Sequence, residues 1–292
     1  MHALVFAAGR GTRLQPYTDD TPKPLLEVGG EPLLRRTLQT VTDTVPGIEQ
    51  FTIVVGYRGD KIVDCIGSTV DGVPVSYAWQ RNRKGLAHAV CRAAEDGYGV
   101  TLAPDDENVN VNVNENENEN EDGEEDKDAN VSDTAFPDDV LTINGDNALD
   151  CDLSALVDRH REPGVDGTLL LDRVSRNEAE ATALCSLAAD GRIRSVESTL
   201  ERGQTTGYMA AGVQTHDGPD LLDACRTLDR ADSGEFELTA ALESLLADGA
   251  QYVGVELDGW HRNVNTPTDL ERARERFEGS AVRSERGSER TK

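Results

Sequence analysis

Two glycines and two cations near the amino terminus are the residues best suited to chemistry. The apolar run at 3–8 predicts a buried strand, which opens into the turn Gly9-Arg10-Gly11, and Arg13 and Lys23 follow that turn. Glycines let the backbone approach an anion with its amide donors exposed. Two cations neutralise the charge of a polyphosphate. The segment therefore predicts a site that binds phosphate groups.

The segment differs from two common phosphate-binding motifs. Leu14 occupies the position of the third glycine in the dinucleotide-binding fingerprint, and no Gly-Lys-Ser/Thr follows at the spacing of a P-loop. A longer pattern resembles the signature of the sugar-1-phosphate nucleotidylyltransferases, a family that includes glucose-1-phosphate uridylyl- and thymidylyltransferases. The pattern is Gly11-Thr12-Arg13-Leu14-x-Pro16-x-Thr18-x-x-x-Pro22-Lys23-Pro24-Leu25.

The resemblance implies an enzyme that transfers a nucleotidyl group from UTP or dTTP to a sugar-1-phosphate, giving a nucleoside-diphosphate sugar and pyrophosphate. A sugar phosphate oxygen attacks the α-phosphorus, and Mg²⁺ is the implied cofactor. Arg13 and Lys23 are then the catalytic residues, because they can stabilise charge at the α-phosphate. The nucleotide-binding residues that the resemblance implies in this segment are Ala8, Gly9, Gly11 and Thr12.

A second segment, residues 80–89, resembles the part of the family that reads the base. Gln80 fits that role because a side-chain amide both donates and accepts hydrogen bonds. Gly85 begins the turn that packs beside the nucleotide, and Leu86 stands where the family usually has threonine. We expect His88 to face a helix-packing surface and assign it no catalytic role.

The implied metal ligands lie far apart in the sequence. Asp146 follows the predicted strand 140–143, and carboxylates at the carboxyl ends of parallel strands meet ligands in the crevice there. Mg²⁺ prefers one or two such oxygens together with phosphates and water. The segment 260–270 resembles the family element whose aspartate completes the site, but Asn263 stands at that position. We expect Asn263 to bind Mg²⁺ through its uncharged amide oxygen, with weaker affinity.

The resemblance is weakest on the sugar side. Glu197 fits the family residue that holds sugar hydroxyls, and Gly212 fits the glycine that lets the backbone approach the sugar. Ser198 replaces the lysine that grips the sugar phosphate, and a serine cannot replace a cation. Arg194 and Arg202 are the candidate replacements.

Two other functions stay open because of this gap. One is a non-catalytic paralogue that senses a nucleotide or a sugar. The other is a cytidylyltransferase that acts on a non-sugar phosphate. Pyrophosphate release separates the first from the enzyme, and a screen of acceptors separates the second.

The order of apolar and helix-like stretches predicts an α/β fold. We expect a Rossmann-like three-layer α/β/α domain of the nucleotide-diphospho-sugar transferase type, with a mainly parallel mixed sheet and a small β-hairpin part that binds the sugar. The domain spans 1–278 and is interrupted at 104–138 by an acidic, low-complexity loop, which we expect to be disordered together with the tail 279–292. The predicted strands are 3–8, 51–55, 74–78, 140–143, 168–171, 208–215 and 251–256, and the hairpin joins 183–188 to 192–197. The predicted helices are 31–44, 58–66, 84–95, 153–161, 219–228, 236–247 and 268–278.

Composition limits the partners and the compartment. With 55 acidic and 29 basic residues, the net charge of −26 argues against nucleic acid and anionic membranes as partners. Acidic excess with scarce lysine is typical of proteins that stay soluble in concentrated salt, and it predicts a halophilic archaeal source. No signal peptide or apolar span of ~20 residues is evident, so we expect a cytoplasmic protein. The family resemblance also allows a homo-oligomer.

Overall fold

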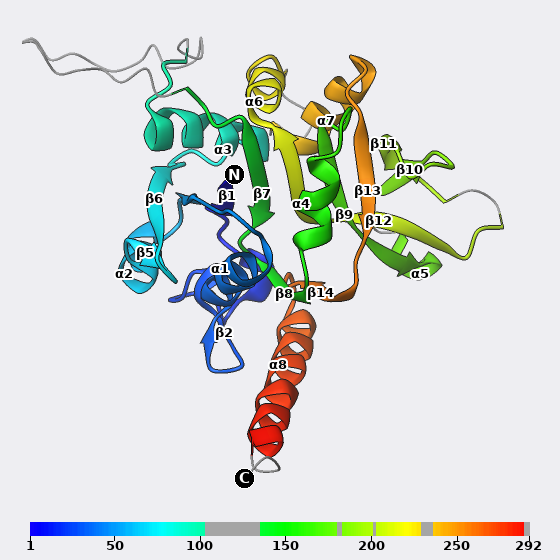
Figure 1. Ribbon diagram of the computed structural model, residues 1–292. Coiled ribbons are helices and arrows are strands. Elements are labelled where there is room, and N and C mark those ends of the chain that lie inside the picture. The colour runs from blue at the N-terminus through cyan, green and yellow to red at the C-terminus, as the bar shows by residue number, and fades with distance from the viewer. Residues whose placement is uncertain (103–134, 180–182, 201–202, 229–235, 289–292) are drawn as a thin grey trace, which may run out of the picture.

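The computed structural model describes residues 1–102, 135–179, 183–200, 203–228 and 236–288, with the backbone alone for 279–288. Figure 1 shows a layered body from which one long helix, α8, projects. Most of the loop predicted at 104–138 lies outside the described residues, as do Arg202 and the last four residues of the predicted tail.

A ten-stranded mixed sheet forms the centre of the described part of the chain. Its middle is parallel, since β1 lies between β4 and β7, and β6 follows β4. Beyond β7 the sheet continues antiparallel through β12, which also pairs with β9 and β10, and β13 runs parallel to β9. The strands of this sheet are β1 His2–Ala7, β4 Gln50–Val55, β5 Thr69–Val70, β6 Val73–Trp79, β7 Asp139–Asn144, β9 Gly167–Ser175, β10 Leu184–Leu187, β11 Ile193–Ser198, β12 Thr206–Asp217 and β13 Tyr252–Glu256.

Both faces of the sheet are covered by helices, which confirms the three-layer α/β/α prediction. Leu4 and Phe6 of β1 belong to a core cluster with residues of α3, α6 and α7. Ala3 and Val5 belong to the opposite cluster, with residues of α1, α2 and α4. Successive side chains of a strand point to opposite faces, so the consecutive apolar residues 3–7 of β1 require two covered faces. The helices are α1 Leu33–Thr44, α2 Gly59–Ile66, α3 Leu86–Arg92, α4 Ser154–His160, α5 Arg176–Ala179, α6 Gly218–Arg226, α7 Leu238–Ala247 and α8 Pro267–Ser288.

Helix α8 is longer than the sequence indicated. We predicted a helix over 268–278 and a disordered tail after it, whereas α8 continues to Ser288. The extension holds four good helix formers, namely one alanine, two arginines and one glutamate, together with three serines, one valine and two glycines. Each glycine, at positions 279 and 287, costs a helix about 1 kcal/mol relative to alanine. Residues 289–292 lie outside the described part.

A separate two-stranded sheet, missed in the sequence, matters most for the site. Strand β8 (Asn147–Cys151) follows directly after Asp146, and it pairs antiparallel with β14 (Gly259–Asn263). In this register Asn263 lies opposite Asn147. The backbone nitrogen of Val264 also donates to the carbonyl oxygen of Asp146 at 3.0 Å. The two distant segments that carry the predicted metal ligands are therefore joined at one place.

Candidate active site

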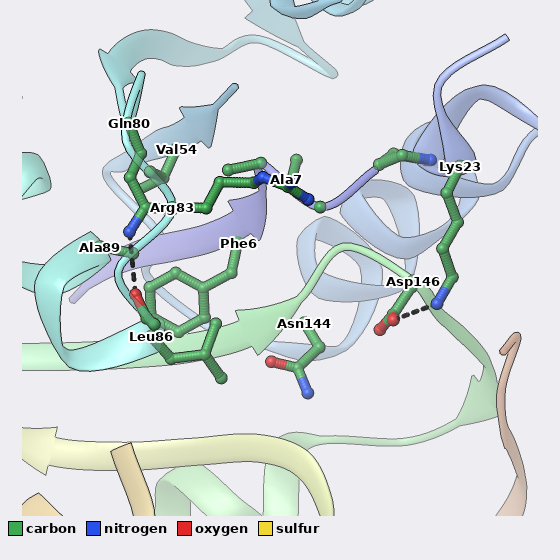
Figure 2. Close-up of a pocket in the computed structure, with 14 residues that line it drawn as sticks. Phe6, Ala7, Lys23, Val54, Gln80, Arg83, Leu86, Ala89, Asn144 and Asp146 are labelled. Atoms are coloured by element: carbon green, nitrogen blue, oxygen red, sulfur yellow. Dashed lines mark hydrogen bonds and ion pairs between the residues drawn. The ribbon is translucent and has the colours of Figure 1, made fainter. Parts of the chain in front are cut away.

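A cavity of about 290 Å³ lies at the carboxyl ends of the parallel strands (Figure 2). The cavity is lined by the end of β1, by the last residue of β7 and by side chains from the turn before α3. Ligands in open α/β sheets bind at this edge. The lining residues are Phe6, Ala7, Ala8, Gly9, Lys23, Pro24, Val54, Gln80, Arg83, Gly85, Leu86, Ala89, Asn144 and Asp146.

Lys23 joins the glycine turn to the end of β7. Its Nζ lies 2.5 Å from Oδ2 of Asp146, an ion pair that Figure 2 marks, and 2.9 Å from Oδ1 of Asn265. The same Asn265 oxygen accepts from Nη2 of Arg13 at 3.0 Å. The two predicted catalytic cations therefore converge on one place beside the predicted metal ligand. Such convergence of positive charge is what a polyphosphate requires.

Two oxygen atoms at this place lack partners. Oδ1 of Asp146 and Oδ1 of Asn263 are both buried, and neither accepts a hydrogen bond from any residue that the structure describes. Buried polar oxygens are rarely left unpaired, so each oxygen is suited to a partner such as an ion or a water molecule. A carboxylate and an amide oxygen are hard ligands of the kind that Mg²⁺ takes. The residues present therefore fit the implied cation.

The donor set for that cation is small. Among the described residues, no three His, Cys, Asp or Glu side chains are grouped so that they could hold a metal ion. Mg²⁺ commonly binds through one or two protein oxygens and takes its remaining ligands from substrate phosphates and water. The site is therefore suited to a cation that arrives with a nucleotide.

The glycine turn requires glycine at position 11. Gly11 has a φ of +65°, and a Cβ built there would lie 3.0 Å from Cβ of Lys23. Its carbonyl accepts from the hydroxyl of the buried Thr18 at 2.8 Å. Ala8 and Gly9 line the cavity, whereas Thr12 is exposed and does not. The turn thus holds Lys23 close to the strand end.

Gln80 lies on the side of the cavity opposite Lys23 (Figure 2), and its amide nitrogen is hydrogen-bonded within the protein. Its Nε2 lies 2.8 Å from the carbonyl oxygen of Gly85 and 2.9 Å from Nδ1 of His88. A carbonyl only accepts, so the atom facing Gly85 is the nitrogen, and both amide hydrogens have protein acceptors. The Oε1 oxygen is left as the acceptor that Gln80 can offer a ligand. His88, expected to serve packing alone, therefore orients this amide.

The sugar-side residues are separated in the structure. Gly212 has a φ of +69° and lies against Asn144, whose side-chain nitrogen a Cβ at this position would strike. Glu197 is exposed on β11 and is absent from the cavity lining; its backbone nitrogen donates to Oε1 of Glu243 at 3.0 Å. Ser198 donates its hydroxyl to the carbonyl of Leu184. Gly212 thus borders the cavity residues, and the role of Glu197 stays a prediction.

Three residues near the site were not predicted. Arg83 and Asn144 line the cavity, and Figure 2 labels both among the cavity side chains. Asn265 contacts both cations. Arg83 and Asn144 each lie within three residues of a predicted site residue, so their positions in the sequence could have suggested them. Asn265 lies two residues after the predicted ligand Asn263, so its position could have suggested it as well.

Comparisons with known proteins agree with the resemblance found in the sequence. A family model described as nucleotidyl transferase matches residues 2–99, which include the glycine turn, Lys23 and Gln80. The UTP–glucose-1-phosphate uridylyltransferase AglF of Haloferax volcanii is 29% identical over 278 residues, covering 95% of this chain and 97% of that protein. The chain is thus similar to the nucleotidyl transferase family in its first third and to this relative over nearly its whole length.

Other proteins that are similar to this chain differ in length. The bifunctional protein GlmU of Methanococcus maripaludis strain C5 is 24% identical, and the alignment covers 95% of this chain but 54% of that protein. The chain thus spans about half the length of that relative. A solved structure from Bacillus anthracis, assigned as a glucose-1-phosphate thymidylyltransferase in complex with sucrose, superposes with a TM-score of 0.70 at 22% identity and covers 95% of both chains. That likeness confirms the fold type. Among the described residues, none of the helices has the length and hydrophobicity that a membrane span requires.

Proposed function

We propose that the protein transfers a uridylyl or thymidylyl group from UTP or dTTP to a sugar-1-phosphate and releases pyrophosphate. The observation that carries the proposal is the convergence of Lys23 and Arg13 beside Asp146. In addition, Asp146 and Asn263 each bury one oxygen that has no partner among the described residues, and the pairing of β8 with β14 joins their segments. This arrangement supplies positive charge and a cation site at one strand edge. Both are requirements of phosphoryl transfer.

The residues of the chain divide the work of this reaction. A phosphate oxygen of the acceptor forms a bond to the α-phosphorus, and the bond from that phosphorus to the β-bridging oxygen breaks, so pyrophosphate leaves with the electron pair. Lys23 and Arg13 stabilise the negative charge that develops on the α-phosphate oxygens. Mg²⁺, held by Asp146 and Asn263, would supply further neutralisation of phosphate charge when bound.

The hydrogen bonds of Gln80 support a uracil or thymine base. Because both amide hydrogens already have protein acceptors, Gln80 offers a base its Oε1 acceptor. Uracil and thymine carry a ring N3–H donor that matches an acceptor, whereas the N3 atom of cytosine is itself an acceptor. If N3 of cytosine faced Oε1 of Gln80, two acceptors would meet and neither would be paired, which costs about 1–3 kcal/mol. The relative AglF, named for its use of UTP, agrees with this choice.

The acceptor is proposed as a hexose-1-phosphate, since AglF is named for glucose-1-phosphate. The test is pyrophosphate release in about molar KCl with Mg²⁺, crossing five nucleoside triphosphates with a panel of hexose-1-phosphates and phosphocholine. Asp146→Ala serves as the blank. Release with UTP or dTTP and one hexose-1-phosphate, lost in the blank, would support the proposal. Nucleotide binding without any release would favour the sensing paralogue, and release with CTP and phosphocholine would favour the cytidylyltransferase.

A further inference from the structure

The side-chain oxygen of Asn265 receives a hydrogen bond from each of the two cations of the signature segment. Nη2 of Arg13 lies 3.0 Å from it and Nζ of Lys23 lies 2.9 Å from it. The two charged nitrogens are therefore separated by at most about 6 Å, twice the longer distance, and they repel each other. We propose that Asn265 is a positioning residue, which holds both cations in register for the phosphates of the nucleotide. The inference rests on the proposed function for its catalytic part.

The two cations depend on Asn265 to different degrees. Lys23 is nearly buried and also pairs with Asp146. Arg13 is exposed, and within the described residues its one hydrogen bond is the one to Asn265. An exposed arginine has many rotamers, and ordering it during the reaction would cost conformational entropy. Asn265 removes much of that cost in advance by fixing the direction of the guanidinium group.

Asn265 can act as a reference point because its own backbone is held. It lies between the end of β14 and the start of α8, and its backbone nitrogen donates to Oδ2 of Asp269 at 3.2 Å. The same carboxylate oxygen accepts from the backbone nitrogen and the hydroxyl of Thr266 at 2.9 and 2.8 Å. On the other side, Val264 donates to the backbone of Asp146. The turn therefore links the cations to the strand that carries Asn263.

The neutral amide is the important chemical property of this residue. A carboxylate at 265 would also accept from Arg13 and Lys23, but it would cancel one positive charge. With Asp146 already paired to Lys23, no net positive charge would then remain on these four groups at neutral pH. An amide orients both cations and leaves one net positive charge for the triphosphate.

The test uses Asn265→Ala and Asn265→Asp in the full-length protein, with Asn177→Ala on the exposed surface of α5 as a matched control. UTP binding is measured by calorimetry without acceptor, and kcat and KM by pyrophosphate release. Asn265→Ala is expected to lower kcat about tenfold or more with little change in the KM of the sugar phosphate. Asn265→Asp is expected to weaken UTP binding about tenfold or more, although the orienting hydrogen bonds are kept. Unchanged kcat in the first variant together with unchanged UTP binding in the second would overturn the proposal.

A double-mutant cycle with Arg13→Ala separates positioning from a structural role. If Asn265 acts through Arg13, Asn265→Ala should lower kcat much less in the Arg13→Ala background than in the wild type. Equal fold-losses in the two backgrounds, or a large fall in thermal stability of Asn265→Ala, would refute positioning. If the wild type binds UTP but releases no pyrophosphate, the proposed function fails by itself. The cycle is then measured on UTP affinity, where non-additive losses would still support the inference.

Discussion

Lys23 and Asp146 stand 123 residues apart in the sequence, yet their charged atoms lie 2.5 Å apart at the end of the parallel sheet. The pair leaves Oδ1 of Asp146 buried and without a partner among the described residues. One carboxylate can therefore orient the predicted catalytic cation with one oxygen and offer its other oxygen to a metal ion. This division of the two oxygens underlies the first two predictions.

Replacing Lys23 by glutamine should lower kcat by about 10²–10³, because the variant loses a cation that stabilises charge in the transition state. The measurement is pyrophosphate release at saturating substrates. Lys61→Gln is the matched control, since Lys61 is exposed and donates to the backbone of Asp20 outside the cavity. A Lys23→Gln enzyme within threefold of the wild type would contradict the role.

Replacing Asn263 by aspartate should strengthen Mg²⁺ binding. The change adds a negative charge to an oxygen ligand without changing the length of the side chain, and cation affinity rises with ligand charge. We expect the Mg²⁺ concentration for half-maximal activity to fall by roughly tenfold, and Asn263→Ala to raise it. Titration of activity with Mg²⁺ at fixed UTP checks both. The idea fails if the three enzymes share one Mg²⁺ dependence.

Replacing Gln80 by leucine should weaken selection of the base. The variant lacks the Oε1 acceptor, and losing one such hydrogen bond of about 1.4 kcal/mol corresponds to a tenfold rise in the KM for UTP. The preference for UTP over CTP should shrink by a similar factor. Gln39→Leu on α1 controls for the loss of a glutamine elsewhere. If the preference for UTP over CTP did not change, Gln80 would have no role in reading the base.

Replacing Gly212 by alanine should destabilise the protein and disturb the cavity. A left-handed φ of +69° and a contact with the side chain of Asn144 both oppose a Cβ there, at about 1–3 kcal/mol. Gly30→Ala is the matched control, because Gly30 has a φ of +81° but open space around its Cβ position. The measurements are denaturant unfolding and kcat/KM for the sugar phosphate. Equal losses of stability and of kcat/KM in the two variants would show that the contact with Asn144 has no effect.

Protonation of His216 should make the protein less stable in acid. Burial lowers the pKa of His216 to about 3, and its ring bonds Tyr252 and Thr142. The unfolded chain, with a pKa near 6.5, binds one more proton between those two values. The contribution of His216 to the free energy of unfolding is therefore complete above pH 6.5. It is lost as the pH falls toward 3, by up to about 1.4 kcal/mol per pH unit.

The measurement for His216 is the unfolding free energy of wild type and His216→Gln at several pH values. Carboxylates that titrate in acid are common to both proteins, so the difference between the two curves isolates the histidine. The variant should show a shallower decline below pH 6.5. Parallel curves would show that His216 does not contribute to acid sensitivity.

The sequence by itself determined the layers and identified the segment that we predict to bind phosphate. Strand β1 is apolar from residue 3 to residue 7, β4 has four apolar residues among six, and α1 repeats its apolar residues at helical spacing, so period and length identify them locally. The glycine turn and Lys23 lie within one stretch of chain whose spacing carries the family signature. The hairpin of β10 and β11 was likewise predicted from its turn.

Only the tertiary structure decided how the distant segments of the site come together. Strands β8 and β14 are short and partly polar, with no pattern that distinguishes them from loops, and they exist because each pairs with the other. That pairing brings Asn263 and Asn265 to Asp146 and Lys23. Hydrogen bonding also decided which atoms remain available, as with the amide of Gln80. Local periodicity is a property of neighbouring residues, whereas these contacts join residues more than a hundred positions apart and form only when the chain has folded.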